Sequence, residues 1–503
     1  MHAQSNKYTI FERRPDLSVK ERFLIAYMVS YQKYRGQVTR LARKYKVSRP
    51  FIYKTVKIFS AHLEDCFGQT KPSYHDTQSS LKSIVSFRME GKCNIQPIST
   101  LLQRFGFEHT SVGFISQVLT QVGKVLGNKL DFDDADCFTF VVCTDEIFSK
   151  GCPILITVDP KSLLILNIEL VERRDAATWI SHFQDIKNQK ITIIKLIKDG
   201  GVGMRAAQQI AMPDAEVQSD TYHAVAHRLG LYVNQYLSKA YHLIGEEYEC
   251  ERLLVNAKTE KVRLKRKEEY VLAQSNAQVA IDTYEDFKFL YHCLLECFQL
   301  FDKEGNLKDL NKVIANFDTA LELMKSLNIN EVNSEMKCIE NCKSELFTFF
   351  QSAKEIYAKL LQSIDIEILS PLCLAWQSRK NWIKAKDRNR HKWFKNKELH
   401  LLNHVKERCG NNYQTVKTTV YEHLDNIIQS SAAVECINSI LRPYLNSMKN
   451  NVTQEFLNLF MFYHNHRRFK GGLRKGKTPF EIATGCQNQE DWLELVVQKV
   501  GLN

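Results

Sequence analysis

The stretch "FTFVVCTDEIFSKG", residues 138–151, decides how the centre of this chain folds. Its apolar and β-branched residues, from Phe138 to Cys143, predict a buried strand. The strand then runs directly into two acids, Asp145 and Glu146. Carboxylates at the end of a buried strand indicate either a turn that has reached the surface or a cation held at that end.

The segments that follow predict a mixed sheet with helices on its faces. Two more short strands are expected in "PILITVD" and "LLILNIELV", joined by a turn at Asp159-Pro160-Lys161. A helix in "DAATWISHFQDIKN" leads to another buried strand, "ITIIKLIKDGG", and a second helix, "GMRAAQQIA", leads to a short strand, "AEVQSD". The expected order is therefore β-β-β-α-β-α-β.

Length and charge narrow the class of protein. A chain of 503 residues exceeds one hydrophobic core, so two to four domains are expected. The net charge of +12 is typical of proteins that bind nucleic acid, although many basic proteins bind none. No stretch approaches the roughly 18 apolar residues of a membrane span, and the N-terminus lacks the apolar core of a signal peptide. We therefore expect a cytoplasmic protein with no membrane partner.

The N-terminal region predicts three helices over residues 18–62. Within it, "QVTRLARKYKVSRPFIYKTVKIF" has the pattern of a helix-turn-helix, with a short turn at Val47-Ser48 and a second helix from about Pro50. A second helix pair is expected over 97–123, and a plain helical hairpin is the alternative for each pair. The residues of the first motif that are expected to contact DNA are Arg49, Tyr53, Lys54 and Lys57.

From about residue 224 to 428 the strand pattern disappears and a long all-helical region is expected. Its stretch 379–397, "RKNWIKAKDRNRHKWFKNK", contains nine Lys or Arg residues and one acid. Basic charge would hold phosphates and the interleaved indoles would stack on an unpaired base, whereas the alternative is a solvated face with two Trp anchored in the core. The candidate DNA contacts here are Arg379, Lys380, Trp382, Arg388, Arg390 and Trp393.

Two cysteine pairs in this helical region are spaced by four residues, at 293/297 and 338/342. Both zinc binding and reduced, unreactive thiols fit that spacing.

Three acids stand out by position. Asp145 ends the first strand and Asp199 ends the fourth, where two glycines allow a tight turn. If the strands are neighbours, both carboxylates emerge at one edge, where they repel each other unless a hard cation such as Mg²⁺ is bound. Glu435 lies in the apolar helix "SSAAVECINSILR", on one face with Asn438 and Arg442. A favourable interaction with the helix dipole is the alternative role for Glu435.

Together these segments resemble the DDE transposases, and in particular the Mutator-like and bacterial insertion-sequence members. "TDEIF" resembles the first-Asp motif, and "IKDGGVGMRAAQQIAMPDAEVQSDTYHAVAHRL" is similar to the segment in which a strand-end Asp followed by Gly is the second catalytic acid. That segment closes with a C/D-x-x-H motif, here Asp220 and His223. "AAVECINSILRPYLN" resembles the catalytic Glu helix and "GKTPFEIATG" resembles the family's tail, so the resemblance covers most of residues 20–485.

The resemblance implies a multidomain α+β protein whose RNase H-like mixed-sheet core is interrupted by a large all-α insertion. The expected segments are an N-terminal helix-turn-helix at 1–65, a second helix-turn-helix-like region at 66–130, the first part of the core at 131–227, the insertion at 228–428, and the Glu helix with the C-terminal tail at 429–503.

The resemblance also implies the site. Asp145, Asp199 and Glu435 are the expected catalytic and metal-binding acids, with two Mg²⁺ ions, or Mn²⁺ in their place, as cofactors. The expected supporting residues are Asp220, His223 and Asn438. Asp220 is the alternative second acid because it also ends a strand, but the longer strand before Asp199 favours Asp199. The tryptophan common in the family's insertion corresponds to Trp376 or Trp382.

The implied function is that of a prokaryotic, nucleoid-associated DNA transposase that cuts and joins duplex DNA. Its DNA partners would be the element's terminal inverted repeats and a target duplex, and at least a dimer is expected because two ends must be joined. A helix-turn-helix DNA-binding protein without catalysis, either a regulator or a decayed transposase, is the alternative. An RNase H-type nuclease is disfavoured by the predicted DNA-binding N-terminus and the basic tail.

Overall fold

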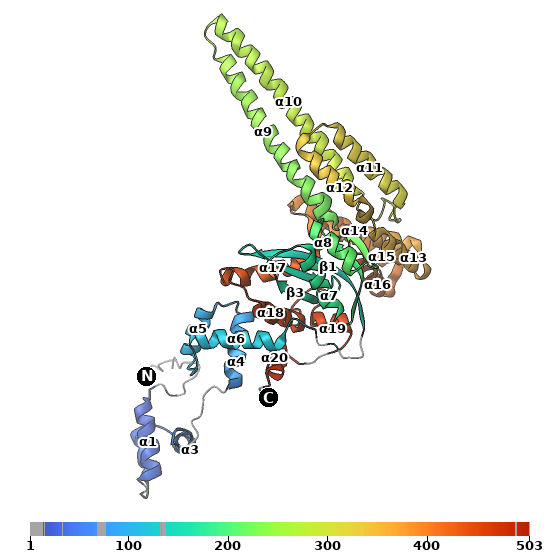
Figure 1. The fold of residues 1–503 in the computed structure, drawn as a ribbon. Helices are drawn as coiled ribbons and strands as arrows, with labels where there is room; N and C mark the ends of the chain where they lie inside the picture. Colours follow the sequence, from blue (N-terminus) through green and yellow to red (C-terminus); the bar gives the residue numbers. More distant parts are fainter. Residues whose placement is uncertain are drawn as a thin grey trace. The chain divides into compact units, whose positions relative to one another are not determined.

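The chain divides into two compact units in a computed structural model (Figure 1). The first unit comprises residues 1–80 and 100–110, and the second comprises 81–99 and 111–503. The structure describes residues 14, 16–32, 34–67, 77–130, 132, 137–487 and 490–501.

The first unit contains a cluster of three helices over the stretch where the sequence predicts three. They are α1 (Val19–Tyr31), α2 (Gln37–Lys44) and α3 (Arg49–Phe67). A capping box starts α1, because the Ser18 side chain accepts from the backbone of Glu21 and the Glu21 side chain accepts from Ser18. Apolar side chains from the three helices and their connections form one small core, which includes Ile25, Leu41, Val47 and Ile52.

The next three helices are α4 (Thr77–Met89), α5 (Ile95–Arg104) and α6 (Val112–Leu126), and the boundary between the units runs through α4 and α5. In the second unit, α6 packs closely on α18 (Gln454–His466). Asn458 donates to the Gly123 carbonyl over 3.0 Å. A Cβ on Gly123 would lie 2.1 Å from the Glu455 carbonyl oxygen, so the close approach requires glycine.

The second unit is built on one five-stranded mixed sheet in the order β3-β2-β1-β4-β5. Its strands are β1 (Phe138–Ser149), β2 (Cys152–Val158), β3 (Ile165–Leu170), β4 (Ile191–Lys198) and β5 (Glu216–Ser219). β1, β2 and β3 pair antiparallel, while β4 pairs parallel to both β1 and β5. The predicted order β-β-β-α-β-α-β is confirmed, and the chain is α+β: mostly helical with a single small mixed sheet among the described residues.

Alternate residues of the strands supply the cores on the two faces of the sheet. Val142 and Leu196 pack with α7 (Ala176–Lys187) and α8 (Val202–Ala211). Cys143 and Ile197 pack instead with α17 (Ala432–Ser447) and α18. Asn465 of α18 donates to and accepts from the Ile165 backbone at 2.9 Å, which fixes that helix against β3.

Between β5 and α17 the described chain is helical apart from one isolated bridge. A π-helix (Tyr222–His227) opens this region, and two short 3-10 helices (Asn330–Val332 and Gly410–Asn412) interrupt it. The α-helices are α9 (Arg228–Val255), α10 (Glu260–Glu296), α11 (Leu310–Ser326), α12 (Asn333–Leu346), α13 (Phe349–Ser363), α14 (Ile366–Lys384), α15 (Arg388–Cys409) and α16 (Tyr413–Asp425). These helices share a large core that includes Phe287, Phe317 and Trp376. At the C-terminal end of the described chain, α18 is followed by α19 (Pro479–Thr484) and α20 (Trp492–Val500).

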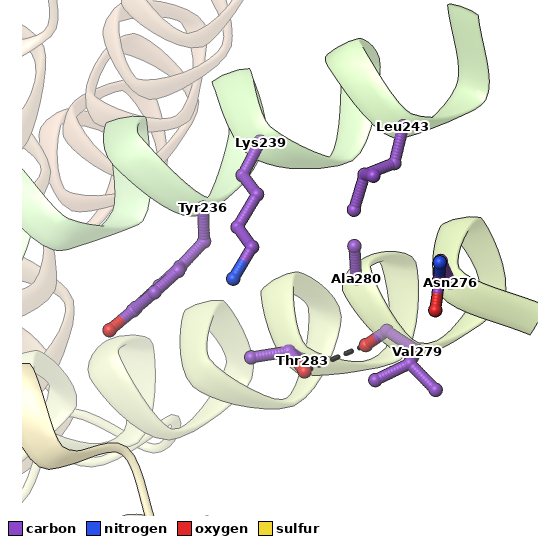
Figure 2. Close-up of a pocket in the computed structure, with 7 residues that line it drawn as sticks. All are labelled: Tyr236, Lys239, Leu243, Asn276, Val279, Ala280 and Thr283. Carbon is purple, nitrogen blue, oxygen red and sulfur yellow. Dashed lines mark hydrogen bonds between the residues drawn. The ribbon is translucent and has the colours of Figure 1, made fainter. Parts of the chain in front are cut away.

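The helices α9 and α10 form a long hairpin, coloured green in Figure 1. A pocket of ≈ 330 Å³ lies between them, and Figure 2 shows Lys239 and Leu243 of α9 on one side and Ala280 and Thr283 of α10 on the other. The Thr283 hydroxyl donates to the Val279 carbonyl of its own helix. The lining of this pocket contains no acid, histidine or cysteine, so it offers no carboxylate, imidazole or thiol to a metal ion.

Among the described residues, no helix combines the length and the apolar character that crossing a membrane requires.

Candidate metal centre

Two acids meet where the parallel pairing of β1 with β4 ends. The prediction that the first strand ends at Asp145 is wrong, because β1 continues to Ser149 by pairing with β2. The pairing of β1 with β4 ends at Cys143 and Ile197, and Asp145 and Asp199 each follow two residues later. Because the two strands run parallel, these residues emerge at the same edge. One carboxylate oxygen each from Asp145, Glu146 and Asp199 lie within 4.8 Å of one another.

Glu146 is the acid that sequence reasoning did not single out as a ligand. Successive strand residues point to opposite faces, so a neighbour of Asp145 is expected to turn away from it. The strand pair with β4 has already ended here, and Arg174, in the turn before α7, forms a short ion pair with Glu146. The Glu146 side chain is only 9% exposed. The sequence feature that could have indicated Glu146 as a ligand is its position directly after Asp145.

Burial makes this carboxylate group costly to ionise. It raises the pKa of Asp145 to about 7, and the neighbouring charges of Asp199, Glu146 and Glu435 act in the same direction. Burial also raises the pKa of Glu146, against the opposing effect of Arg174. A bound divalent cation would reverse both shifts because it stabilises the ionised carboxylates.

α17 brings two more side chains to the group. The Asn438 amide donates to Asp145 Oδ2 over 3.3 Å. Its Oδ1 atom is buried and has no hydrogen-bond partner. A buried acceptor without a partner beside three carboxylates is an arrangement that a metal ion or its bound water would satisfy. Glu435 lies outside the three-carboxylate group, with its Oε1 atom 3.5 Å from His223 Nε2.

Asp220 and His223 hold the start of α17. Asp220 is 1% exposed, and it accepts hydrogen bonds from the backbone N–H groups of Tyr222, His223 and Ser431 and from the Ser431 hydroxyl. His223 Nδ1 also donates to it over 3.0 Å. Burial works to raise the pKa of Asp220, but the His223 and Ser431 hydrogen bonds outweigh it and keep that pKa below its usual value. The hydrogen bond to Asp220 raises the pKa of His223 to about 9, so His223 is a cation at neutral pH.

Asp199 has a different environment from Asp220. Its Oδ1 atom accepts a local hydrogen bond from the Gly201 backbone over 3.0 Å, at the start of α8. A Cβ on Gly201 would lie 3.2 Å from that same oxygen. The structure therefore groups Asp199 with Asp145, while the oxygens of Asp220 are engaged by α17 and the π-helix.

The DNA-contact candidates of the first unit all lie on the surface of α3. Arg49, Tyr53, Lys54 and Lys57 are exposed, and Tyr53 is 59% exposed. Their ring and cationic groups are therefore accessible to a large partner.

The candidates in the second unit differ among themselves. Arg379 forms a two-bond ion pair with Asp425, and the half-buried Trp382 donates to Glu398 over 2.6 Å. Trp376 is buried and also donates to Asp425. Lys380 lies over the ring of Trp376, 4.1 Å from its centroid. In contrast, three candidates on α15 are exposed: Arg388, Arg390 and Trp393.

The cysteine pairs lie on α10 and α12. All cysteines of the described chain are free, and Cys297 and Cys342 are buried. Among the described residues, the group of potential metal ligands is Asp145, Glu146 and Asp199, and it includes no cysteine.

No protein-family model matches this chain, and no curated protein matches it. Among solved structures, a Drosophila P element transposase strand transfer complex is similar with a TM-score of 0.25 and 12% sequence identity. The match covers 88% of this chain and 98% of that chain. At this TM-score the similarity carries no structural argument.

Proposed function

We propose that this protein is a metal-dependent DNA transposase of the DDE type, related to those of bacterial insertion sequences. The observation that carries the proposal is the meeting of Asp145 and Asp199 just beyond the point where β1 and β4 stop pairing, with Asn438 and Glu435 supplied by a helix more than 200 residues further along the chain. The sheet, with three antiparallel strands continued by two parallel ones, is in keeping with an RNase H-like core.

The residues at this edge suit a hard divalent cation such as Mg²⁺, with Mn²⁺ as its alternative. Asp145, Asp199 and Glu146 would hold it through carboxylate oxygens, and the unpartnered Asn438 oxygen would accept from its hydration shell. Held by these residues, a pair of such ions would supply charge stabilisation for the attacking and leaving oxygens of phosphodiester cleavage and strand transfer. Glu435 is the third acid by resemblance.

The chain's own residues would orient this site. Asp220 fixes the first turn of α17 through Ser431, and it holds His223 in the charged form. The His223 cation stands between Asp220 and Glu435, so it sets where the Glu435 carboxylate lies. We assign Asp220, His223 and Asn438 positioning roles rather than chemical ones.

DNA would be held outside the acidic edge, by positive charge. Arg49, Lys54 and Lys57 on α3 are the candidates for contacts with the element's ends. On α15, Arg388 and Arg390 offer phosphate contacts and Trp393 offers a stacking surface. Arg379, Lys380 and Trp382 stay candidates, but a DNA contact would compete with their present partners.

We also propose the division of labour implied by the resemblance. Residues 1–65 and 66–130 would bind DNA, 131–227 and 429–503 would form the catalytic core, and 228–428 would be its insertion. A dimer on two DNA ends, in a prokaryotic cytoplasm, follows from the same proposal.

A DNA-binding protein without catalysis is the second candidate function. The basic charge and the N-terminal helices are expected for both functions. The clustered carboxylates are required only for the catalytic one. The clustering of Asp145, Glu146 and Asp199 favours catalysis, because a purely structural edge gains nothing from bringing three partly buried acids together.

The test is cleavage and joining of duplexes taken from the DNA that flanks the gene, with and without Mg²⁺. The natural protein should cut and join these duplexes only with the metal. Asp145→Asn should bind them equally well and leave them intact, since binding charge lies elsewhere. Asp214→Asn, at an exposed turn acid, is the matched control and should behave as the natural protein. Specific binding without cleavage in either Mg²⁺ or Mn²⁺ would favour the non-catalytic function.

A further inference from the structure

A short segment with three aromatic rings borders the candidate metal centre. It is the π-helix that follows β5, and only Asp220 and Thr221 separate the two elements. His223 Nε2 lies 3.5 Å from Glu435 Oε1. The ring of Tyr222 lies edge-on to the ring of His223, with centroids 5.3 Å apart. A single imidazole therefore separates the Tyr222 ring from one acid of the candidate site.

The π-helical turn is what groups these rings. Residues five apart in an α-helix of 3.6 residues per turn point about 140° apart, whereas the i→i+5 hydrogen bonds of a π-helix bring such residues onto one face. Tyr222 and His227 have this spacing, and their ring centroids are 5.9 Å apart. The rings of His223 and His227 are 6.1 Å apart. We call these three residues the ring cluster.

The ring cluster is held in place by the all-helical region. The Tyr291 hydroxyl of α10 donates to the Ala226 carbonyl of the π-helix over 3.0 Å. Gly230 of α9 leaves room for this contact, because a Cβ there would lie 3.1 Å from the Tyr291 hydroxyl oxygen. Tyr222 nevertheless stays 52% exposed. A fixed segment thus presents an accessible aromatic face beside the carboxylates.

A positive charge accompanies this face. Burial raises the pKa of Tyr291, the neighbouring Tyr222 acts in the same direction, and the charge of Arg390 opposes both. Tyr222 and Arg390 are therefore both neighbours of Tyr291. Arg390 is exposed on the first turn of α15. An aromatic face with a guanidinium close by suits a nucleotide, which offers a flat base and a phosphate.

We propose that the Tyr222 ring stacks on an unpaired nucleobase next to the scissile phosphodiester, while Arg390 contacts a phosphate of the same strand. This subsite rests on the proposed function, because it takes the carboxylates to hold the phosphodiester. The base must be unpaired, since neighbouring bases cover both faces of a base inside a duplex. One strand of a duplex rises about 3.4 Å per nucleotide, so a ring one imidazole away from Glu435 lies about two nucleotides from the carboxylates.

A purely structural role is the alternative for Tyr222, because its ring also covers part of His223 and His227. The two roles differ in what the side chain contributes to DNA binding. A stacking ring adds affinity only where a base is present, whereas a structural ring affects every ligand of the site in the same way.

The test is a comparison of two labelled single strands that carry the same phosphates, a thymidine 12-mer and a 12-mer of abasic nucleotides. Fluorescence anisotropy measures their binding to the full chain in Ca²⁺, a hard cation that carboxylates also bind. Tyr222→Ala should weaken binding to the thymidine strand at least about fivefold and leave binding to the abasic strand unchanged. Arg390→Ala should weaken binding to both strands by the same factor, because it removes a phosphate contact.

Two further variants separate the ring from the fold. Tyr222→Phe keeps the aromatic face and should bind both strands as the natural chain does. Tyr241→Ala removes an exposed tyrosine from α9 and is the matched control, so it should change neither affinity. Equal effects of Tyr222→Ala on the two strands, including no effect on either, would overturn the proposal. The same fivefold loss on a fully paired 12-mer duplex would also overturn it.

This experiment separates the subsite from the proposed catalysis, because it measures binding alone. A chain that never cuts DNA but shows the base-dependent loss in Tyr222→Ala would keep the subsite and refute the transposase proposal. A chain that cuts DNA with Mg²⁺ but shows equal effects on the two strands would do the reverse.

Discussion

The backbone N–H of Ser431 donates to Asp220 Oδ2 over 2.8 Å, across 211 residues of chain. This hydrogen bond ties the residue after β5 to the N-cap of α17, the helix that carries Glu435 and Asn438. A single buried carboxylate thus helps to fix where two residues of the candidate site lie, together with the apolar packing of α17 on the sheet.

Asp199 and Asp220 are the two candidates for the second catalytic acid, and substituting them should change the free energy of unfolding differently. Asp199→Asn removes one charge from a crowded acidic edge, so the free energy of unfolding should stay the same or rise. Asp220→Asn turns an amide N–H₂ toward donors from Ser431 or His223, so unfolding should become easier by about 1–3 kcal/mol. Denaturant titrations in the absence of metal measure both.

The strand-cleavage activities of the same two variants should differ in the opposite direction, with the larger loss at Asp199. Asp199→Asn should abolish Mg²⁺-dependent strand cleavage while DNA affinity is kept. Asp220→Asn should retain partial cleavage, since α17 still packs on the sheet through its apolar face. Normal cleavage by Asp199→Asn with none by Asp220→Asn would reverse our choice of second acid.

Glu146 should contribute to cation binding. Mn²⁺ should raise the melting temperature of the natural protein, because it binds only the folded carboxylate group. Glu146→Gln should reduce that rise, since it leaves two of the three clustered carboxylates. The control is Glu169→Gln, an acid that forms its ion pair with His182 outside this group. An unchanged metal-induced rise in Glu146→Gln would remove this residue from the site.

Much of this arrangement is predictable from sequence, and the reasons are local. Short runs of apolar and β-branched residues predict the strand order, and strand order alone brings Asp145 next to Asp199. Glu146 was not predictable as a ligand, because alternation along a strand argues against two adjacent residues facing one ion. The hydrogen bond between Asp220 and Ser431 was not predictable either, because no local pattern indicates a hydrogen bond between residues so distant in sequence.

The α3 surface should bind DNA phosphates in the full-length protein. Replacing Lys54 and Lys57 with Ala should weaken DNA binding and reduce its dependence on salt, by about 0.9 in the log–log slope for each phosphate that is no longer neutralised. Lys312→Ala/Lys359→Ala removes two exposed lysines from the all-helical region and should change neither quantity. Equal salt slopes for the natural chain and the α3 variant would place the phosphate-binding residues elsewhere.

The close packing of α6 on α18 should tolerate no side chain at Gly123. Gly123→Ala puts a methyl group 2.1 Å from a backbone carbonyl oxygen, so the helices must separate at a cost of about 1–3 kcal/mol or more. Gly113→Ala on the same helix has no atom within 4 Å and should stabilise by up to about 1 kcal/mol through helix propensity. Opposite shifts in the denaturant midpoint are expected, and equal shifts would contradict this packing.

The last prediction concerns acid stability. His464 of α18 is fully buried, and its Nε2 atom donates to the Leu163 carbonyl over 2.9 Å. Burial lowers the pKa of His464 to about 4, while an unfolded histidine has a pKa near 6.5. The unfolded chain therefore binds this proton first, and the stabilisation is complete above about pH 6.5 and is lost as the pH falls towards 4. In that window His464 should cost up to ~1.4 kcal/mol of unfolding free energy per pH unit. His464→Gln keeps an N–H donor and cannot titrate, so its unfolding free energy should fall less steeply between these pH values, although it starts lower at pH 7. Two parallel stability profiles would show that His464 is not kept neutral by the fold.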